Sequence, residues 1–266
     1  MSSPALTQPG YQPSFAGLRT ASPLLWWTSL AFLALFATCL LFAVIDPRLF
    51  NGISVWVKPA KFYLSLAVHM LTLCFGIMLL PQRTRKSRLV AFVTVTMVSM
   101  AIFEMSYITF RAARAEASHF NISSEVAGLL YNAMGAGAAA MMFATAWIGW
   151  QVLRHGPRSL LGRATGSGFL IAAVLTLIVG FTLGGMGSHW IGGDQTDATG
   201  LPLIGWSTTG GDLRISHFIG LHIMQVLPVV ALLGSRALVL ASGLAVTIAG
   251  AATYAQALMG LPLIAF

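Results

Sequence analysis

The sequence predicts an all-α integral membrane protein with seven transmembrane helices, its N-terminus in the cytoplasm and its C-terminus outside. Of its 266 residues, 57% are apolar and only 8% are charged, whereas soluble domains carry roughly 25% charged residues. The apolar residues form seven runs, each long enough to cross about 30 Å of hydrocarbon at about 1.5 Å per residue. Basic and acidic residues fall in different connections between these runs, which gives the chain a direction in the membrane.

The seven expected spans are bounded by charged residues, glycines and prolines. We place them at about residues 24–45, 60–80, 89–110, 126–150, 168–187, 215–233 and 237–259. They form one membrane domain, residues 24–266, preceded by a flexible polar tail at residues 1–23. The last two spans are joined only by residues 234–236, so they should form an antiparallel hairpin. The longest connection, residues 188–214, holds six glycines and two tryptophans, and we expect it to form an outer cap or an interfacial anchor.

The two sides of the membrane follow from the charges. Seven basic residues and no acidic residue lie in the connections after the second and fourth spans: Arg83, Arg85, Lys86, Arg88, Arg154, Arg158 and Arg163. All seven acidic residues lie in or just below the opposite connections: Asp46, Glu104, Glu116, Glu125, Asp194, Asp197 and Asp212. Because cytoplasmic loops carry the excess of Lys and Arg, we expect the acidic side to face outward from the plasma membrane, or from the inner membrane of a Gram-negative cell.

Composition also narrows the partners. The net charge of +8 does not indicate nucleic-acid binding, because the basic residues occupy the short turns that encode topology. The lipid bilayer is the expected partner, with a quinone or another membrane complex as further candidates. Cys39 and Cys74 lie inside apolar runs without Cys-x-x-Cys spacing and are expected to be packing residues. The last span has no lysine for a Schiff base with retinal, so the chain is not a conventional rhodopsin.

Polar side chains follow one face of the second span. Lys58, Lys61, Ser65, His69 and Thr72 are separated by three or four residues, which aligns them along a helix. An ionisable residue inside a membrane is by default a candidate for function. In the competing interpretation, the lysines reach the headgroups and His69 is a satisfied interior histidine.

The third and sixth spans place polar groups at a similar depth. Glu104 lies about 9 Å below the outer end of its helix, where an unpaired carboxylate is costly. We expect it to be protonated, bound to a metal, or paired with Lys61 or Arg111. His222 lies about 10 Å deep, near the level of Glu104. His217 is five residues earlier in the same span and therefore points toward different neighbours.

These residues predict a buried site in the outer half of the bundle. Its expected interior consists of Ser65, His69, Glu104, Asn132 and His222. Its expected ligand-binding rim adds Lys58, Lys61, Arg111, His119, His189, Asp212, Arg214 and His217. Asn132 is counted here with the ligand-binding residues. A positive rim of this kind suits an anionic ligand, a lipid headgroup or a quinone carbonyl.

The residue types suit a membrane enzyme that uses a metal, haem or a quinone. Glu104, His69 and Ser65 are the expected catalytic residues, and His222, His69, Glu104 and His189 are the expected ligands of a transition metal or haem. Such a protein would be a membrane oxidoreductase or a metal-dependent hydrolase. A proton-coupled transporter and a non-catalytic accessory or sensory subunit are the alternatives, since no helix carries His-x-x-x-His or His-Glu-x-x-His spacing.

The pattern Ser65-x-x-x-His69 on the second of seven spans resembles the ceramidase and adiponectin-receptor class of intramembrane zinc hydrolases. That class adds a His-x-x-x-His on its seventh helix, whereas the seventh span here contains no histidine. The resemblance covers only these two residues, so we transfer no residue role from it.

Overall fold

Residues 15–202 and 204–265 are described by a computed structural model, and most of them are helical. Seven of the helices in these ranges are long and apolar enough to span a membrane. They are α2 (Pro23–Ile45), α3 (Val57–Met78), α5 (Arg88–Ala113), α6 (Glu125–His155), α7 (Leu160–Met186), α8 (Leu213–Ala231) and α9 (Arg236–Leu258). The short elements are α1 (Phe15–Ala21), β1 (Leu49–Phe50), β2 (Ile53–Ser54), α4 (Gln82–Arg85), β3 (Trp190–Ile191) and β4 (Gly211–Asp212). The all-α, seven-span architecture is therefore confirmed.

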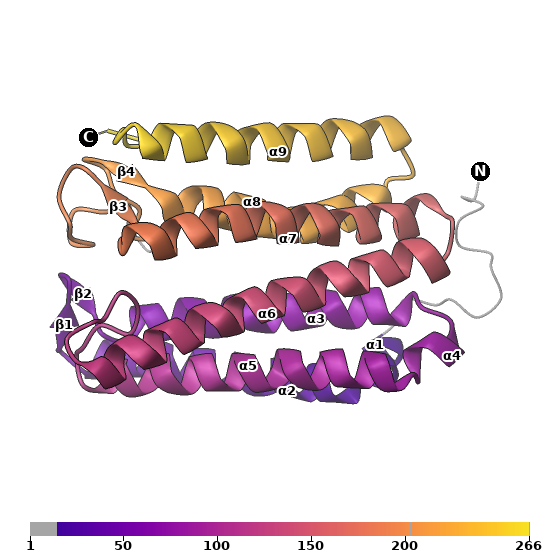
Figure 1. The fold of residues 1–266 in the computed structure, drawn as a ribbon, viewed down its shortest axis with the longest axis horizontal. Coiled ribbons are helices and arrows are strands. Elements are labelled where there is room, and N and C mark those ends of the chain that lie inside the picture. The colour runs from indigo at the N-terminus through magenta and orange to yellow at the C-terminus, as the bar shows by residue number, and fades with distance from the viewer. Residues whose placement is uncertain (1–14, 203, 266) are drawn as a thin grey trace.

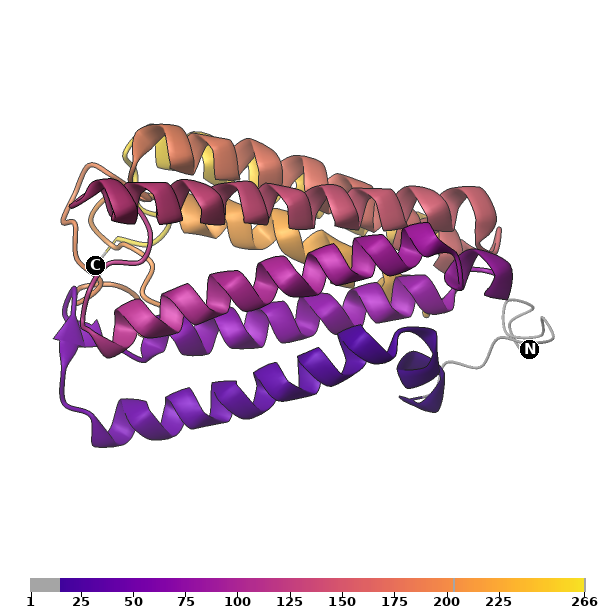
Figure 2. The same ribbon diagram turned by 60° about the horizontal axis from the view of Figure 1, so that its bottom comes forward.

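The spanning helices lie side by side in one bundle (Figure 1). Helices α2, α3 and α5 lie together, α7, α8 and α9 form a second group, and α6 crosses between them (Figures 1 and 2). At one end, β1 pairs with β2 and β3 pairs with β4, both antiparallel. We call this the ribbon end, and we call the opposite end, which holds α4 and the turn between α6 and α7, the basic end. The C-terminus lies at the ribbon end, whereas α1 lies near the basic end (Figure 1).

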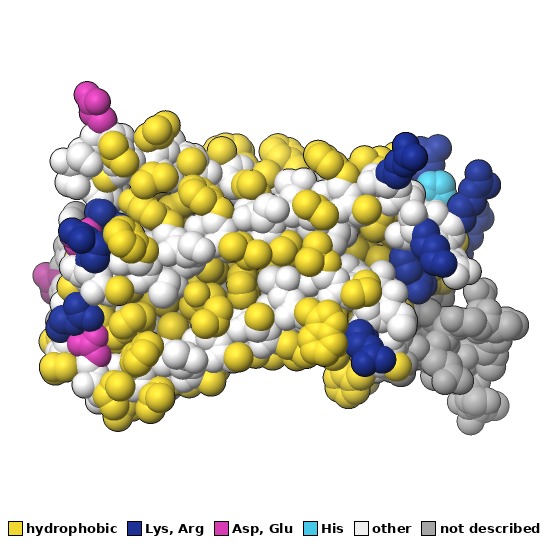
Figure 3. Space-filling model, turned by 90° about the horizontal axis from the view of Figure 1, so that it is seen from below, with side chains coloured by type: hydrophobic (Ala, Val, Ile, Leu, Met, Phe, Trp, Pro, Cys, Tyr) yellow, Lys and Arg dark blue, Asp and Glu magenta, His cyan; other side chains and the backbone are white. Residues whose placement is uncertain are grey.

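The surface between the two ends is apolar. Large side chains such as Leu41, Phe92, Ile178 and Leu240 are exposed along the helices, and hydrophobic atoms cover much of the face in Figure 3. In the same view, the acidic side chains lie at the ribbon end, while basic side chains and one histidine gather at the basic end. An apolar belt between two charged ends is typical of a multi-pass membrane protein. Which end faces the cytoplasm is still a prediction from the basic residues.

The turn between α6 and α7 is shorter than the sequence predicts. The expected spans end at residue 150 and begin again at residue 168, but α6 continues to His155 and α7 begins at Leu160. Hydropathy detects only the part of a helix that lies in hydrocarbon. The sequence therefore predicts a loop where the end turns of these two long helices lie.

Part of the expected N-terminal tail is helical. Residues Phe15–Ala21 form α1, which packs against α2 and α3. The Cys74 thiol of α3 lies 3.5 Å from the Leu18 carbonyl oxygen and 3.4 Å from that of Ser22. The rest of the expected tail, residues 1–14, lies outside the described residues.

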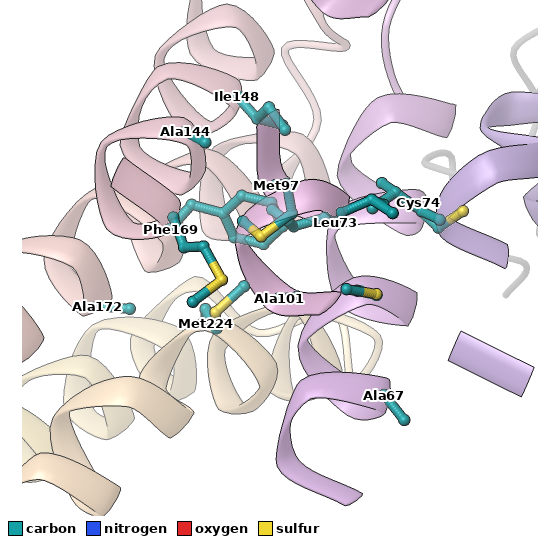
Figure 4. Packing of buried hydrophobic residues seen from close by; sticks show 14 of the residues in the cluster. Ala67, Leu73, Cys74, Met97, Ala101, Ala144, Ile148, Phe169, Ala172 and Met224 are labelled. Carbon is teal, nitrogen blue, oxygen red and sulfur yellow. The ribbon is translucent and has the colours of Figure 1, made fainter. Parts of the chain in front are cut away.

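The apolar core is centred on Phe169 of α7, which is fully buried between α3 and α6 (Figure 4). A Cβ atom added to Gly76 of α3 would lie 2.6 Å from the Phe169 ring. One added to Gly149 of α6 would lie 2.7 Å from the Cβ of Phe169. Leu73 and Met97 pack beside the ring (Figure 4). Two glycines therefore make the room in which three helices meet around one aromatic side chain.

Replacing Gly149 by alanine should destabilise the bundle, because the new Cβ would also lie 2.8 Å from the Gly166 carbonyl oxygen. Overpacking of this kind costs about 1–3 kcal/mol, whereas replacing a helical glycine by alanine gains about 1 kcal/mol. Gly180→Ala is the matched control, since a Cβ there meets no described atom within 4 Å. Thermal unfolding in detergent should show a lower Tm for Gly149→Ala and an equal or higher Tm for Gly180→Ala. Equal Tm values for the two variants would contradict this packing.

A reporter on the C-terminus tests the orientation of the bundle. Alkaline phosphatase, which folds outside the cytoplasm, should be active when fused after residue 266, because the basic end is expected to face the cytoplasm. Green fluorescent protein at the same position should be dark. A reporter inserted after Gly156, in the turn at the basic end, should give the opposite pattern. Cytoplasmic fluorescence from the C-terminal fusion would reverse the topology.

Candidate functional site

Polar side chains from three helices meet near the middle of the bundle. His69 of α3 is buried, and its Nε2 atom lies 2.9 Å from the Thr145 hydroxyl of α6. Thr72, one turn further along α3, accepts a hydrogen bond from the Gln225 side chain of α8 at 3.1 Å. Gln225 Oε1 in turn lies 3.2 Å from His222 Nδ1. These contacts place His69 and His222 within electrostatic reach of each other.

Glu104 lies closer to the ribbon end. Its side chain is only 8% exposed, and its Oε1 atom lies 3.8 Å from His119 Nε2, which is longer than a hydrogen bond. Lys58, in the first turn of α3, is near enough for its charge to act on Glu104. A buried carboxylate therefore faces an imidazole from one side and lies within range of an ammonium group.

Lys61 and Arg111, the partners expected for Glu104, stabilise the outer connections instead. Lys61 Nζ donates to the carbonyl oxygen of Ile204 at 3.2 Å. Arg111 Nη1 lies 2.8 Å from Glu116 Oε2. Arg111 stands in the last turn of α5, and the chain that follows turns back over it, so the carboxylate of Glu116 is the nearer partner.

His119 lies in the connection between α5 and α6, which folds as a compact turn. The Asn121 side chain donates to the Ala117 carbonyl oxygen at 2.8 Å, and the Ser118 hydroxyl lies 3.2 Å from His119 Nδ1. Burial, the charge of Lys58 and two neighbouring histidines together hold the pKa of His119 well below its ordinary value. The imidazole is therefore neutral at pH 7.

Aromatic rings surround the histidines at the ribbon end. The ring centroid of Phe62 lies 5.4 Å from that of His119, and the centroid of Tyr131 lies 6.4 Å away. Phe120 lies 5.5 Å from Tyr131 and 6.0 Å from His189. The φ angle of Phe120 is 57°, in the left-handed region that bulky residues rarely adopt. The fold thus holds this ring between two neighbours at a cost in backbone energy.

Three buried nitrogen atoms at this end have no hydrogen-bond partner among the described residues: His189 Nε2, Trp190 Nε1 and His217 Nδ1. The rings of His189 and Trp190 lie 3.9 Å apart, centroid to centroid. His189 and His217 are both within electrostatic reach of His119. Burial and the charge of Arg214 lower the pKa of His189 to about 3, so this ring is also neutral. An unpaired buried polar atom costs about 1–3 kcal/mol, and here several such atoms lie in one region.

The connection between α7 and α8 covers the ribbon end through one ion-pair network. Arg214 lies 2.7 Å from Asp212 and 2.7 Å from Asp197, and it donates to the Gly205 carbonyl oxygen at 2.7 Å. The Ser207 amide donates to Asp212 Oδ2 at 3.0 Å. Burial alone would raise the pKa of Asp212, but the hydrogen bonds from Arg214 and Ser207 hold it below its ordinary value. The charges of Arg214, Asp197 and Asp212 are therefore paired within the cap.

The structure brings some expected site residues together and separates others. His69 and His222 form the deeper group, and the upper group consists of Lys58, Glu104, His119, His189 and His217. Ser65 is half-buried on α3 and has no hydrogen-bond partner among the described residues. Asn132 is exposed on α6, because it is the preceding residue, Tyr131, that turns toward the histidines. Asp212 and Arg214 belong to the cap.

The expected metal ligands do not form a metal site in the described residues. No group of three or more His, Cys, Asp and Glu side chains is placed there to hold a metal ion. His69 contacts Thr145, and His222 contacts Gln225, whereas Glu104 and His189 belong to the upper group. The expectation of a metal or haem therefore rests on residue type alone.

Sequence reasoning missed the aromatic part of the site. Phe62, Phe120 and Tyr131 lie beside the histidines. Of these three, only Phe62 could have been found from the sequence, because it follows Lys58 by one helical turn and so lies on the same face of the helix. A hollow of about 590 Å³ opens at the ribbon end and is lined by Arg111, Arg114, Glu116, Ala117, Phe120, Asn121, Ile122 and Ser123. Phe120 is thus a wall of this hollow and a neighbour of His189, which connects the surface to the buried nitrogens.

Acidification should weaken this end of the bundle before it affects the carboxylates. His119 and His189 are neutral when folded and have lowered pKa values, so their contribution to stability is complete above their unfolded pKa of about 6.5 and declines as the pH falls below it. We expect the free energy of unfolding to fall by up to about 5 kcal/mol between pH 7.5 and pH 4.5, roughly 2.7 kcal/mol for each ring. Thermal unfolding in detergent at constant ionic strength measures this loss as a fall in Tm.

A double variant, His119→Gln with His189→Gln, should lose less Tm over the same pH range. His155→Gln is the control, because His155 is exposed at the basic end. An unchanged pH profile in the double variant would show that these two rings are not the groups that take up protons.

No protein family, curated protein or solved structure matches this chain.

Proposed function

We propose that this protein is a quinone-binding component of the plasma membrane, which holds the quinone carbonyl oxygens at the ribbon end and exchanges protons with them. The observation that carries the proposal is the group of unpartnered buried nitrogens, His189 Nε2, Trp190 Nε1 and His217 Nδ1, among the residues that the structure describes. The indole nitrogen can only donate, and each neutral imidazole offers a donor or an acceptor. A ligand with acceptor oxygens would give these atoms the partners they lack.

The charge balance favours a neutral ligand over an anion. His119 and His189 are neutral because their pKa values are lowered, and the charge of Lys58 is opposed by Glu104 nearby. The cap adds Arg214, but its charge is matched by Asp212 and Asp197. Hydrogen-bond donors without excess positive charge suit carbonyl oxygens, which accept hydrogen bonds but carry no full charge.

The aromatic rings support the same ligand class. Phe62, Tyr131 and Phe120 present apolar faces around the histidines, and the Trp190 ring lies against that of His189 at a tilt of 40°. Flat ring systems pack against such side chains in stacked or edge-to-face geometry. The site also lies within a bundle that is apolar outside, where a lipid-soluble quinone would be present.

The buried groups that ionise near neutral pH reach only halfway through the bundle. On the basic side of His69, the buried polar side chains among the described residues are Ser22, Ser29, Thr94, Gln151 and Thr165, and none of them ionises at physiological pH. A carrier that moved protons across the membrane would need ionisable groups in both halves. This one-sided distribution supports a site that exchanges protons with the ribbon end only.

Glu104 and His119 are the groups suited to proton exchange. Glu104 Oε1 and His119 Nε2 are 3.8 Å apart. A small movement, or one atom that bridges them, would connect the two groups by hydrogen bonds. His119 lies in the connection that also lines the surface hollow, through Phe120 and Asn121. Conversion of a quinone to a quinol takes up two electrons and two protons. This chain would supply the protons, and a membrane partner would carry the electrons.

Quinone binding can be tested by thermal shift of the purified protein in detergent, with menadione and decylubiquinone as probes. Trp190→Phe should weaken quinone binding roughly threefold to tenfold, because it removes one hydrogen-bond donor but keeps an aromatic ring. Without quinone, the variant should be as stable as the wild type or more stable, since it removes a buried donor that has no described partner.

Trp150→Phe is the matched control, because Trp150 is exposed near the basic end. It should leave the quinone affinity unchanged. A wild-type Tm that neither quinone raises would refute the proposal. Equal losses of affinity in Trp150→Phe and Trp190→Phe would refute the location of the site.

A further inference from the structure

A second hollow lies at the basic end, far from the histidines of the ribbon end. It has a volume of about 350 Å³ and lies between the last turn of α6 and the first turns of α7. Its walls are Leu153, Pro157, Arg158, Arg163 and Ser167. The two arginines come from different elements, Arg158 from the turn and Arg163 from α7, so both guanidinium groups border one space.

Both arginines are exposed, and neither guanidinium group has a hydrogen bond or ion pair with any described residue. Two other arginines at this end do have partners. Arg85 donates to the carbonyl oxygens of Met78 and Leu80, and Arg154 lies over the Trp150 ring at 5.1 Å from its centroid. All seven acidic residues lie in the half of the bundle that includes the ribbon end. No carboxylate side chain is therefore available to neutralise the positive charge of the hollow.

The residues around the hollow are of the kind expected at the level of the lipid headgroups. Trp150 is 44% exposed and Leu153, in the wall of the hollow, is 41% exposed. An exposed tryptophan beside an arginine is typical of the membrane interface. One side of the hollow therefore faces hydrocarbon through Leu153, while the arginines face the headgroup layer.

We propose that this hollow binds the phosphate of an anionic phospholipid. Arg158 and Arg163 would donate to the phosphate oxygens, a geometry that guanidinium groups favour, and the acyl chains would lie along Leu153. Basic pockets between membrane helices recognise lipid headgroups in this way. The lipid would join the ends of α6 and α7 where only a short turn connects them. This site is independent of the quinone proposal.

Native mass spectrometry of the full-length protein, released from detergent micelles that contain either phosphatidylglycerol or phosphatidylcholine, tests the inference. The wild type should retain phosphatidylglycerol in preference to phosphatidylcholine. The double variant Arg158→Gln with Arg163→Gln should lose this preference, with a roughly tenfold lower affinity for phosphatidylglycerol. Its circular dichroism spectrum and its Tm in phosphatidylcholine should match the wild type, since both side chains are exposed and unpaired.

The control is Arg83→Gln with Lys86→Gln, which removes the same charge from the same end but outside the hollow, where both residues are exposed. It should keep the wild-type preference. An equal loss in both double variants would show attraction to the basic end as a whole and overturn the site. Inorganic phosphate should raise the Tm of the wild type less than phosphatidylglycerol does. An equal rise in Tm would overturn the lipid assignment in favour of free phosphate.

Discussion

The packing of the helices depends on Phe169 of α7, which fills the space between α3 and α6. The ring is fully buried, and it fits only because Gly76 and Gly149 carry no side chain. Lipid supplies no hydrophobic force that drives one membrane helix against another, so close packing must hold helices together. The contact joins α7, in one group of helices, to α3, in the other. It therefore joins the two groups in the basic half, where the buried polar side chains among the described residues are uncharged.

Polar side chains link the helices near the middle of the bundle. There, α3 and α8 are linked by the hydrogen bond from Gln225 to Thr72, and α3 and α6 are linked by His69 and Thr145. Such interhelical hydrogen bonds contribute modestly to stability in membranes, roughly 0.6 kcal/mol on average. Their larger role is orientation, because they hold the imidazole rings of His69 and His222 in one position.

The sequence was sufficient for the helical architecture, but it placed Glu104 and His222 at one level, whereas Glu104 lies with His119, closer to the ribbon end. Apolar length and charge placement predicted seven spans, since hydrocarbon thickness and the cost of burying charge constrain every helix in the same way. Helical spacing also predicted that Lys58 and His69 share a face. Spacing within one helix cannot show which neighbour that face meets. Glu104 was therefore assigned to Lys61 or Arg111, when its neighbours are His119 and Lys58.

Asn132 and Phe120 also show what spacing within one helix cannot predict. Asn132 was expected in the site and lies outside it, whereas Phe120 was not expected there and belongs to it. Depth alone made Asn132 a site residue, but the rotation of α6 leaves it exposed. Phe120 carried no polar signal, and its contact with His189 depends on a left-handed backbone at φ 57° that the sequence does not indicate. Rotation of helices and the path of connections are set by tertiary packing. They require the structure, whereas the spans do not.

The two ends of the protein treat charge in opposite ways, and the cost of burial explains why. At the ribbon end, polar groups are inside the bundle, so the structure keeps them neutral or paired: the pKa values of His119 and His189 are lowered, and Arg214 is matched by two carboxylates. At the basic end, the guanidinium groups of Arg158 and Arg163 are exposed and have no partner among the described residues, so water solvates them. An unpaired ion is tolerated at the surface but not in the interior, since burying it costs far more than burying a neutral polar group. The proposals of a neutral carbonyl ligand in the interior and of an anionic headgroup at the surface both rest on this physical constraint.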